Sequence, residues 1–162
     1  MVIKVNYENV LNDKNVDFRD LDESLFLLGL LSVFDNRYQA KADGFYQEIS
    51  WKQFFSIICI SLCTEPPSIK ELSEIMGSSH QNVKQILLKL EKKGFVQIVV
   101  DDADRRKQRV LLTEKTMRFC EEHQEKADKI VGSIFQGVSN EQKQITIQTI
   151  LQMEENIRNV EV

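Results

Sequence analysis

The spacing of apolar and polar positions along the chain predicts a mainly helical protein. Residues 1–18 are polar and aperiodic, and they indicate no regular element. Residues 20–23 have the form of a helix cap, an acceptor followed three positions later by Glu. They predict a first helix that runs to about Lys41, with a break at Gly44. Its leucines recur at helical spacing: Leu21, Leu25, Leu28 and Leu31.

The second predicted helix is apolar on nearly all sides. A capping box at residues 50–53 opens it, and Glu65-Pro-Pro67 is expected to end it because proline has no amide donor. A helix of this composition must be central and buried. Its apolar residues are Phe54, Phe55, Ile57, Ile58, Ile60 and Leu62.

Two shorter helices follow, with Gly77 between them. A capping box at residues 68–71 opens the first, and residues 78–81 are expected to cap the second. The second closes with two lysines and Gly94, which favours a left-handed C-terminal cap. The apolar faces are Ile69, Leu72, Ile75 and Met76 in the first helix and Val83, Ile86, Leu87 and Leu90 in the second.

The apolar period changes after Gly94. Residues 95–100 are β-branched and aromatic, residues 101–107 form a polar turn, and residues 108–112 read as a returning strand. The pattern therefore predicts a β-hairpin. Two further helices complete the chain, a long one capped by Thr113 and a last one capped by Ser139.

The composition indicates a cytoplasmic protein of one domain. The chain has 162 residues, no basic N-terminal start followed by an apolar run, and no apolar stretch long enough to cross a bilayer. Its three cysteines are an odd number, which argues against a disulfide framework. No metal-ligand cluster, cofactor motif or nucleophile–base arrangement is present, so we expect no metal, no cofactor and no enzymatic activity.

The charge is unevenly distributed. The whole chain carries −4, but residues 80–115 hold nine Lys and Arg against five Asp and Glu, whereas the remainder holds 12 against 20. An acidic body with one basic segment is compatible with binding to a polyanion, and equally with a solvated charged surface.

The order helix, glycine turn, helix, hairpin is that of a winged helix-turn-helix. Such a protein places its second helix, here about 79–93, in the major groove, where base edges present distinct donors and acceptors. A polar face on any surface helix would look the same, and the exposed Leu88 is not explained by base reading. The candidate DNA-binding residues of this region are Ser78, Ser79, His80, Gln81, Asn82, Lys84, Gln85 and Lys89.

The hairpin, about 95–112, is the more specific feature. Its turn is expected to project four cations toward the minor groove or the backbone: Arg105, Arg106, Lys107 and Arg109. Asp101 and Asp104 are candidate braces, because a carboxylate can fix a guanidinium through paired hydrogen bonds. The alternative is an ordinary charged hairpin with local ion pairs.

These motifs resemble the MarR family of bacterial transcription regulators. The wing pattern is Asp101-x-x-Asp104-Arg-Arg followed by Val110-Leu-Leu-Thr113, and the upstream matches are Leu72, Gly77, Val83, Leu90, Glu91 and Gly94. The resemblance implies that Arg106 is the wing arginine, with Asp104 as its brace. It also implies a homodimer on a pseudo-palindromic double-stranded DNA operator, acting as a repressor. The implied regions are 20–48 and 116–162 for dimerisation and 50–115 for DNA binding.

The sequence also departs from the family pattern. Ile98, Val99 and Gln85 stand where many relatives have arginine, and Thr116 replaces a common glycine. These departures leave open a winged-helix module that binds protein instead of DNA. A thiol-based redox regulator is a separate alternative.

The family resemblance also implies an effector, often a small aromatic molecule. Tyr38, Phe45, Tyr46 and Trp51 are the candidate pocket residues, although aromatics at helical spacing more often form core. Cys59 and Cys63 are four positions apart on the apolar helix, where buried thiols are usually inert.

Overall fold

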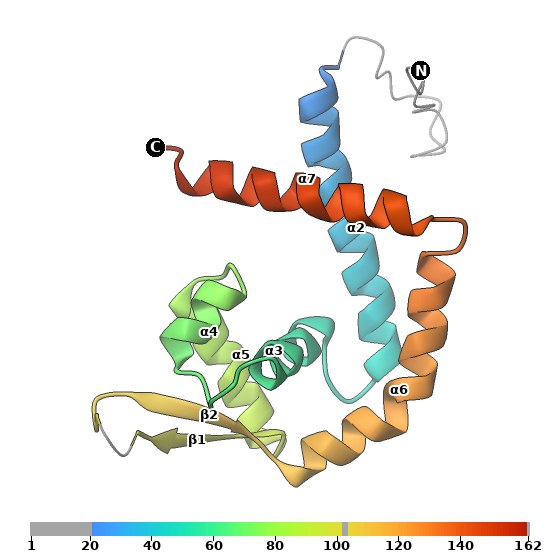
Figure 1. The fold of residues 1–162 in the computed structure, drawn as a ribbon. Coiled ribbons are helices and arrows are strands. Elements are labelled where there is room, and N and C mark those ends of the chain that lie inside the picture. The colour runs from blue at the N-terminus through green and yellow to red at the C-terminus, as the bar shows by residue number, and fades with distance from the viewer. Residues whose placement is uncertain (1–20, 102–103, 162) are drawn as a thin grey trace. The chain divides into compact units, whose positions relative to one another are not determined.

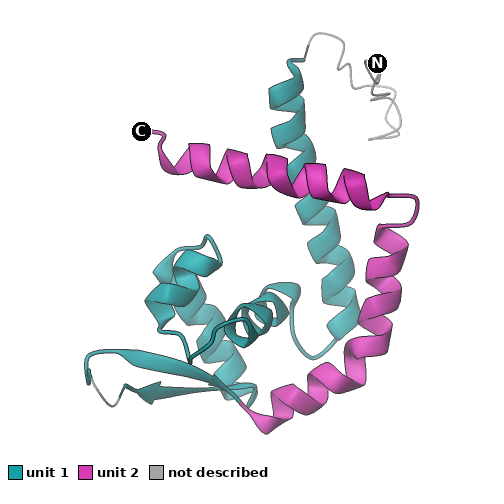
Figure 2. Cartoon of the chain, in the orientation of Figure 1, with its two compact units in different colours: residues 1–112 teal, residues 113–162 magenta. Residues whose placement is uncertain are grey.

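A computed structural model of the chain describes residues 21–101 and 104–161 (Figure 1). They fall into two compact units that divide between Leu112 and Thr113 (Figure 2). The expectations for residues 1–18, and the cap proposed at Asp20, lie outside the described residues. The fold is a winged helix-turn-helix: helices α2 to α5, a two-stranded hairpin, then helices α6 and α7.

Helix α2, Glu23–Tyr46, is longer than the sequence pattern predicts. Its N-cap is Asp22, whose carboxylate accepts hydrogen bonds from the backbone amides of Ser24 and Leu25. The predicted break at Gly44 is wrong, because the helix continues until Phe45 and Tyr46 are buried in the core. Burial of two aromatic side chains outweighs the cost of one helical glycine, which is about 0.5–1 kcal/mol.

Helix α3, Trp51–Ser61, begins at the predicted capping box. The Ser50 hydroxyl accepts from the Gln53 amide, and the Gln53 side chain accepts from the Ser50 amide at 3.0 Å. The helix ends before the two prolines, with Leu62 as its C-cap. The interior residues are buried or half-buried as expected, but Leu62 is 77% exposed because it lies past the last helical turn.

Helices α4, Ile69–Ile75, and α5, His80–Lys92, form the helix-turn-helix. The Ser68–Glu71 capping box opens α4 as predicted. Gly77 and Gly94 both have positive φ, 57° and 78°, which is why glycine follows each helix. Ile75, expected on the buried face of α4, is the last residue of the helix and is 50% exposed.

Strands β1, Val96–Val100, and β2, Gln108–Leu112, pair antiparallel with Val96 opposite Leu112. The hairpin closes one side of the lobe core, because its inner residues pack with α4 and α5. Side chains with no exposed surface fill this core: Leu72, Val83, Leu87, Leu90, Phe95 and Val110. The sheet is thus part of the same packed body as the two short helices.

The second unit consists of α6, Glu114–Ile134, and α7, Asn140–Arg158. Thr113 caps α6, and a third capping box, formed by Ser139 and Gln142, opens α7. No residue of α7 is buried. Within the part of the chain that the structure describes, no helix combines the length and the apolar character that crossing a membrane requires.

Candidate nucleic-acid interface

Helix α5 has one buried and one open face. Val83 and Leu87 are fully buried, whereas Gln81, Lys84 and Gln85 are exposed on the opposite side. This split follows from the sequence, since apolar residues recur every three or four positions and fix which side faces the core. The open side therefore presents amide and ammonium groups, which suit base edges and phosphates.

The first turn of α5 is capped one residue later than predicted. The Ser79 hydroxyl, not that of Ser78, accepts from a backbone amide of the turn, that of Asn82, at 3.3 Å. The Ser78 hydroxyl instead accepts from the Asn82 side-chain amide at 2.8 Å. Ser78 is half-buried, whereas Ser79, His80 and Asn82 are exposed at the start of the helix.

A cleft of about 440 Å³ lies between α4, the start of α5 and the hairpin. The predicted DNA-binding residues His80 and Lys84 line it from α5, and Arg106 and Lys107 line it from the hairpin. The cleft thus brings Lys84 together with Arg106 and Lys107, which lie more than 20 positions later in the sequence. The other lining residues are Ser68, Ile69, Lys70, Glu71, Glu74 and Gln108.

Asp104 holds Arg106 at the tip of the hairpin. One oxygen, Asp104 Oδ1, accepts from the Arg106 backbone amide at 3.1 Å and from Arg106 Nε at 3.2 Å. These two bonds, the side-chain bond first, lower the pKa of Asp104 below its ordinary value. The Arg106 side chain is nevertheless 92% exposed. Its guanidinium is therefore oriented by the protein and still open to solvent, as are Arg105 and Lys107.

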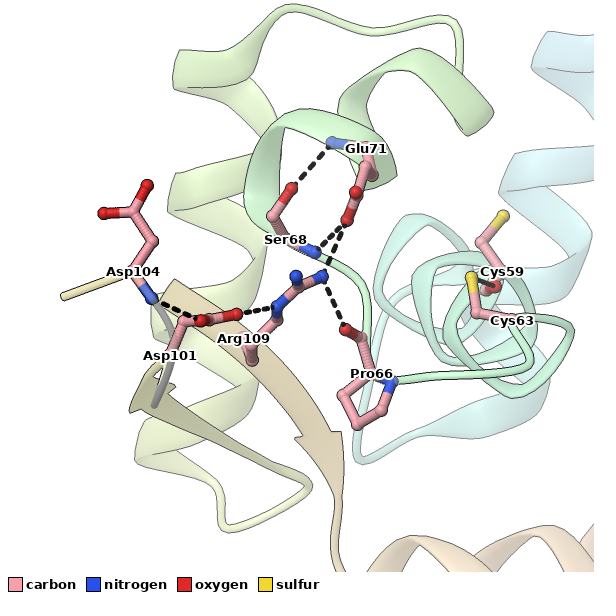
Figure 3. Close-up of polar contacts among 8 residues, drawn as sticks. All are labelled: Cys59, Cys63, Pro66, Ser68, Glu71, Asp101, Asp104 and Arg109. Carbon is pink, nitrogen blue, oxygen red and sulfur yellow. Dashed lines mark hydrogen bonds and ion pairs between the residues drawn. The ribbon is translucent and has the colours of Figure 1, made fainter. Parts of the chain in front are cut away.

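Arg109 does not project from the turn, so that expectation is wrong (Figure 3). Its guanidinium lies against the body, with Nε donating to Asp101 Oδ2 at 2.5 Å and Nη1 to Glu71 Oε2 at 3.1 Å. The side chain is only 29% exposed. The reason is its place in β2, where Arg109 forms an antiparallel bridge with Ser68 and so lies beside the segment that leads into α4.

Two lobe contacts carry chemistry that the sequence analysis did not find. Glu91 of α5 accepts from the Ile98 backbone amide of β1 at 2.9 Å. Lys93, just after α5, donates to the Glu48 carbonyl at 2.6 Å and to Gln53 Oε1 at 3.4 Å. Residue type alone suggested only dipole-stabilising cations there, and no local pattern indicates partners 40 or more positions away.

The four aromatics of the predicted effector pocket pack into an aromatic cluster. The rings of Tyr38 and Trp51 meet edge to face with centroids 4.6 Å apart, and those of Phe45 and Tyr46 do so at 4.5 Å. Phe54 stacks on Tyr46 at 4.1 Å. These contacts are those of a core, and a ligand site at this place stays a prediction.

Of the two neighbouring thiols, Cys59 belongs to α3, and Cys63 lies just past the end of that helix. Cys63 Sγ donates to the Cys59 carbonyl at 3.2 Å. Burial, and secondarily the neighbouring Cys63, raises the pKa of Cys59, and burial likewise raises the pKa of Cys120. A raised pKa lowers the thiolate fraction and with it the reactivity toward oxidants. Among the described residues, no group of three or more His, Cys, Asp or Glu is placed to hold a metal ion.

Comparison with known proteins identifies the winged lobe. Residues 49–107 match the model of the MarR family. The chain is also similar in structure to a MarR protein from Peptoclostridium difficile, with a TM-score of 0.77 and 21% identity over 91% of this chain and 95% of that one. A MarR/EmrR family transcriptional regulator from Acinetobacter sp. ADP1 gives 0.76 and 16% over 86% and 100%.

A third solved structure contains DNA. It is the S. aureus MepR–DNA complex, with a TM-score of 0.71 and 17% identity over 79% of this chain and 95% of that one. At these identities the solved structures establish the fold. The match of residues 49–107 to the MarR family model confirms the resemblance seen in the sequence.

Proposed function

We propose that this chain, whose residues 49–107 belong to the MarR family, is a sequence-specific DNA-binding transcription regulator that acts as a repressor. The observation that carries the proposal is the exposed Arg106, held by Asp104 beside the cleft that Lys84 of α5 also lines. A groove-sized helix and an oriented guanidinium thus face the same side of one rigid lobe. That is the arrangement a protein needs to contact a major groove and the adjacent minor groove or backbone.

The open face of α5 is proposed to read bases. Gln81 and Gln85 offer amides that can pair with adenine, and Lys84 can reach guanine or a phosphate. The remaining predicted residues of the helix start, with Lys89, would contact the backbone. In the proposal, Arg105, Arg106 and Lys107 bind phosphates or the minor groove, where a narrow groove concentrates negative potential.

A second copy of the chain is proposed to complete the protein. Large apolar residues are exposed on three helices, and exposed apolar surface of this extent marks an interaction site. A symmetric dimer buries the same surface twice and presents two winged lobes to a pseudo-palindromic operator. The exposed residues include Leu25, Leu28 and Phe34 of α2, Val131 of α6, and Ile145, Ile147, Leu151 and Ile157 of α7.

A small aromatic effector and a cytoplasmic location complete the proposal. The aromatic cluster around Tyr38 and Trp51 is already packed, so an effector would have to displace ring contacts that are present. The raised thiol pKa of Cys59 disfavours the redox alternative.

Selection of bound sites from random duplexes by the purified protein, followed by a salt series on the selected site, tests the function. Specific binding should weaken steeply as salt rises, because each neutralised phosphate releases a counterion. Arg106→Ala should weaken binding by about 10- to 100-fold and reduce the salt slope by about 1. The matched control is Arg118→Ala, which removes an exposed arginine from α6. Failure to bind duplex DNA even at low salt would refute the proposal and would favour a protein-interaction module instead.

A further inference from the structure

Arg109 joins three segments that are remote in sequence. From β2 it bonds to Asp101 at the end of β1 and to Glu71 in α4, and Nη1 also donates to the Pro66 carbonyl at 3.2 Å (Figure 3). The Asp101 side chain is 11% exposed and that of Arg109 is 29% exposed. The Arg109–Asp101 bond is therefore partly buried and stronger than the same bond in water, whereas Glu71 is 54% exposed.

The partner in α4 is the residue that also starts that helix. Glu71 Oε2 accepts from the Ser68 backbone amide at 2.7 Å, which is half of the capping box, and from Arg109 Nη1 at 3.1 Å. One carboxylate oxygen therefore serves the first turn of α4 and the base of the hairpin. A backbone contact runs beside it, where the Val110 amide donates to the Pro67 carbonyl at 3.0 Å.

The same contacts continue outward to the hairpin tip. Asp101 uses its second oxygen to accept from the Asp104 backbone amide at 2.8 Å. Asp104 in turn bonds to Arg106. An unbroken series of polar contacts thus leads from Glu71 through Arg109, Asp101 and Asp104 to the exposed guanidinium of Arg106.

The two strands of the hairpin are attached to different helices. Strand β1 is bonded to α5, where Glu91 accepts from the Ile98 amide. Strand β2 is bonded to α4 through Arg109 and Glu71. Loss of the Arg109 side chain would leave the first attachment intact and weaken the second, so the tip would move relative to α5 without loss of the fold.

We infer that Arg109 is a positioning residue that sets where the hairpin tip, and with it Arg106, lies relative to α5. It does so through Asp101 and Glu71, and it does not itself contact DNA. The inference rests on the proposed DNA-binding function. It separates the four hairpin cations into three that face outward and one that holds them in place.

Binding of the selected duplex by the full-length protein tests this role in three variants. Arg109→Ala removes the guanidinium, and Arg109→Lys keeps the charge but not the planar set of donors. Glu71→Gln keeps a capping-box acceptor for Ser68 and removes the ion pair. Arg118→Ala again controls for loss of a surface arginine.

Arg109→Ala should weaken binding by about tenfold, and Arg109→Lys and Glu71→Gln should weaken it in the same direction by less. The double variant Arg106→Ala/Arg109→Ala should bind no more weakly than Arg106→Ala, because a residue that acts through another gives non-additive effects. Hydroxyl-radical cleavage should show the loss of protection under the hairpin while protection under α5 persists.

Three results would overturn the role. They are unchanged binding by Arg109→Ala, binding by Arg109→Lys equal to that of the parent, or strictly additive losses in the double variant, which would make Arg109 a direct contact. Amide hydrogen exchange in α3 and α5 shows whether a variant is folded. A folded variant should match the parent, and an unfolded one should exchange faster. Failure of the parent protein itself to bind DNA would refute the proposed function, whereas a binding parent with an unaffected Arg109→Ala variant would refute only this inference.

Discussion

The winged lobe and the C-terminal helices share the same helix-capping signals but differ in how far their apolar side chains are buried. The lobe encloses side chains with no exposed surface, Leu87 and Phe95 among them, whereas α7 buries none of its residues. Both regions begin helices with a serine capping box, Ser68 in α4 and Ser139 in α7. Local signals therefore form helices in either region, but the lobe buries its apolar residues within the single chain whereas α7 does not.

The difference teaches where each region obtains its stability. A short helix such as α4 is marginal alone and persists because Ile69 and Leu72 are buried against neighbours in the same unit. The apolar residues of α7 are not buried in the single chain, so another surface must cover them. A second copy of the chain is our proposal for that surface.

The largest expected effect is in the lobe core. Leu87→Ala should lower the free energy of unfolding by about 2–5 kcal/mol, because it removes a fully buried side chain and leaves a cavity. Urea denaturation measures the change. Leu88→Ala is the matched control, since Leu88 is 42% exposed on the same helix and should cost far less. Equal losses in the two variants would mean that α5 does not bury the face assigned to it.

The next effect concerns α7. Leu151→Glu places a charge where the proposed dimer buries a leucine that is 63% exposed in the single chain. The dissociation constant of the dimer should rise by about 10- to 100-fold, as sedimentation equilibrium would measure. Thr149→Glu, far from Leu151 around the helix but next to Ile145, is the comparison and should weaken the dimer less. A monomeric parent protein would remove the basis for this comparison.

The smallest effect compares the capping boxes. Ser68→Ala should cost about 1 kcal/mol of lobe stability, because it removes the acceptor for the Glu71 amide at the start of α4. Ser139→Ala should destabilise α7 by a similar amount and leave the lobe unaffected, as residue-resolved hydrogen exchange would show. If Ser139→Ala lowered protection in the lobe to the same degree, the two regions would not be separately stabilised.

Much of the lobe could be predicted because its signals are local. The capping boxes at Ser50 and Ser68, the left-handed Gly94 and the β-branched run after it each depend on residues within about five positions. The winged-helix fold followed from their order. The end of α2 could not be predicted this way, because burial of Phe45 and Tyr46 by distant residues overrides the local preference of Gly44.

The candidate site was only partly accessible to sequence reasoning. The exposed polar face of α5 follows from helical periodicity alone. Arg109 was assigned with the outward cations because its neighbours are cations, yet its partners Pro66 and Glu71 lie 43 and 38 positions earlier. A pattern confined to the hairpin contains no information about that pairing.

The contacts of Lys93 limit how helix α5, the proposed DNA-reading helix, can move. Its ammonium bonds to the Glu48 carbonyl and to the Gln53 side chain, so the C-terminal end of α5 is fastened at the beginning of α3. A tilt of α5 during operator search would therefore pivot at this lysine and swing the opposite end, where Ser79 begins the helix. Adjustment to different DNA sequences would then be greatest at His80 and Gln81 and smallest at Lys92.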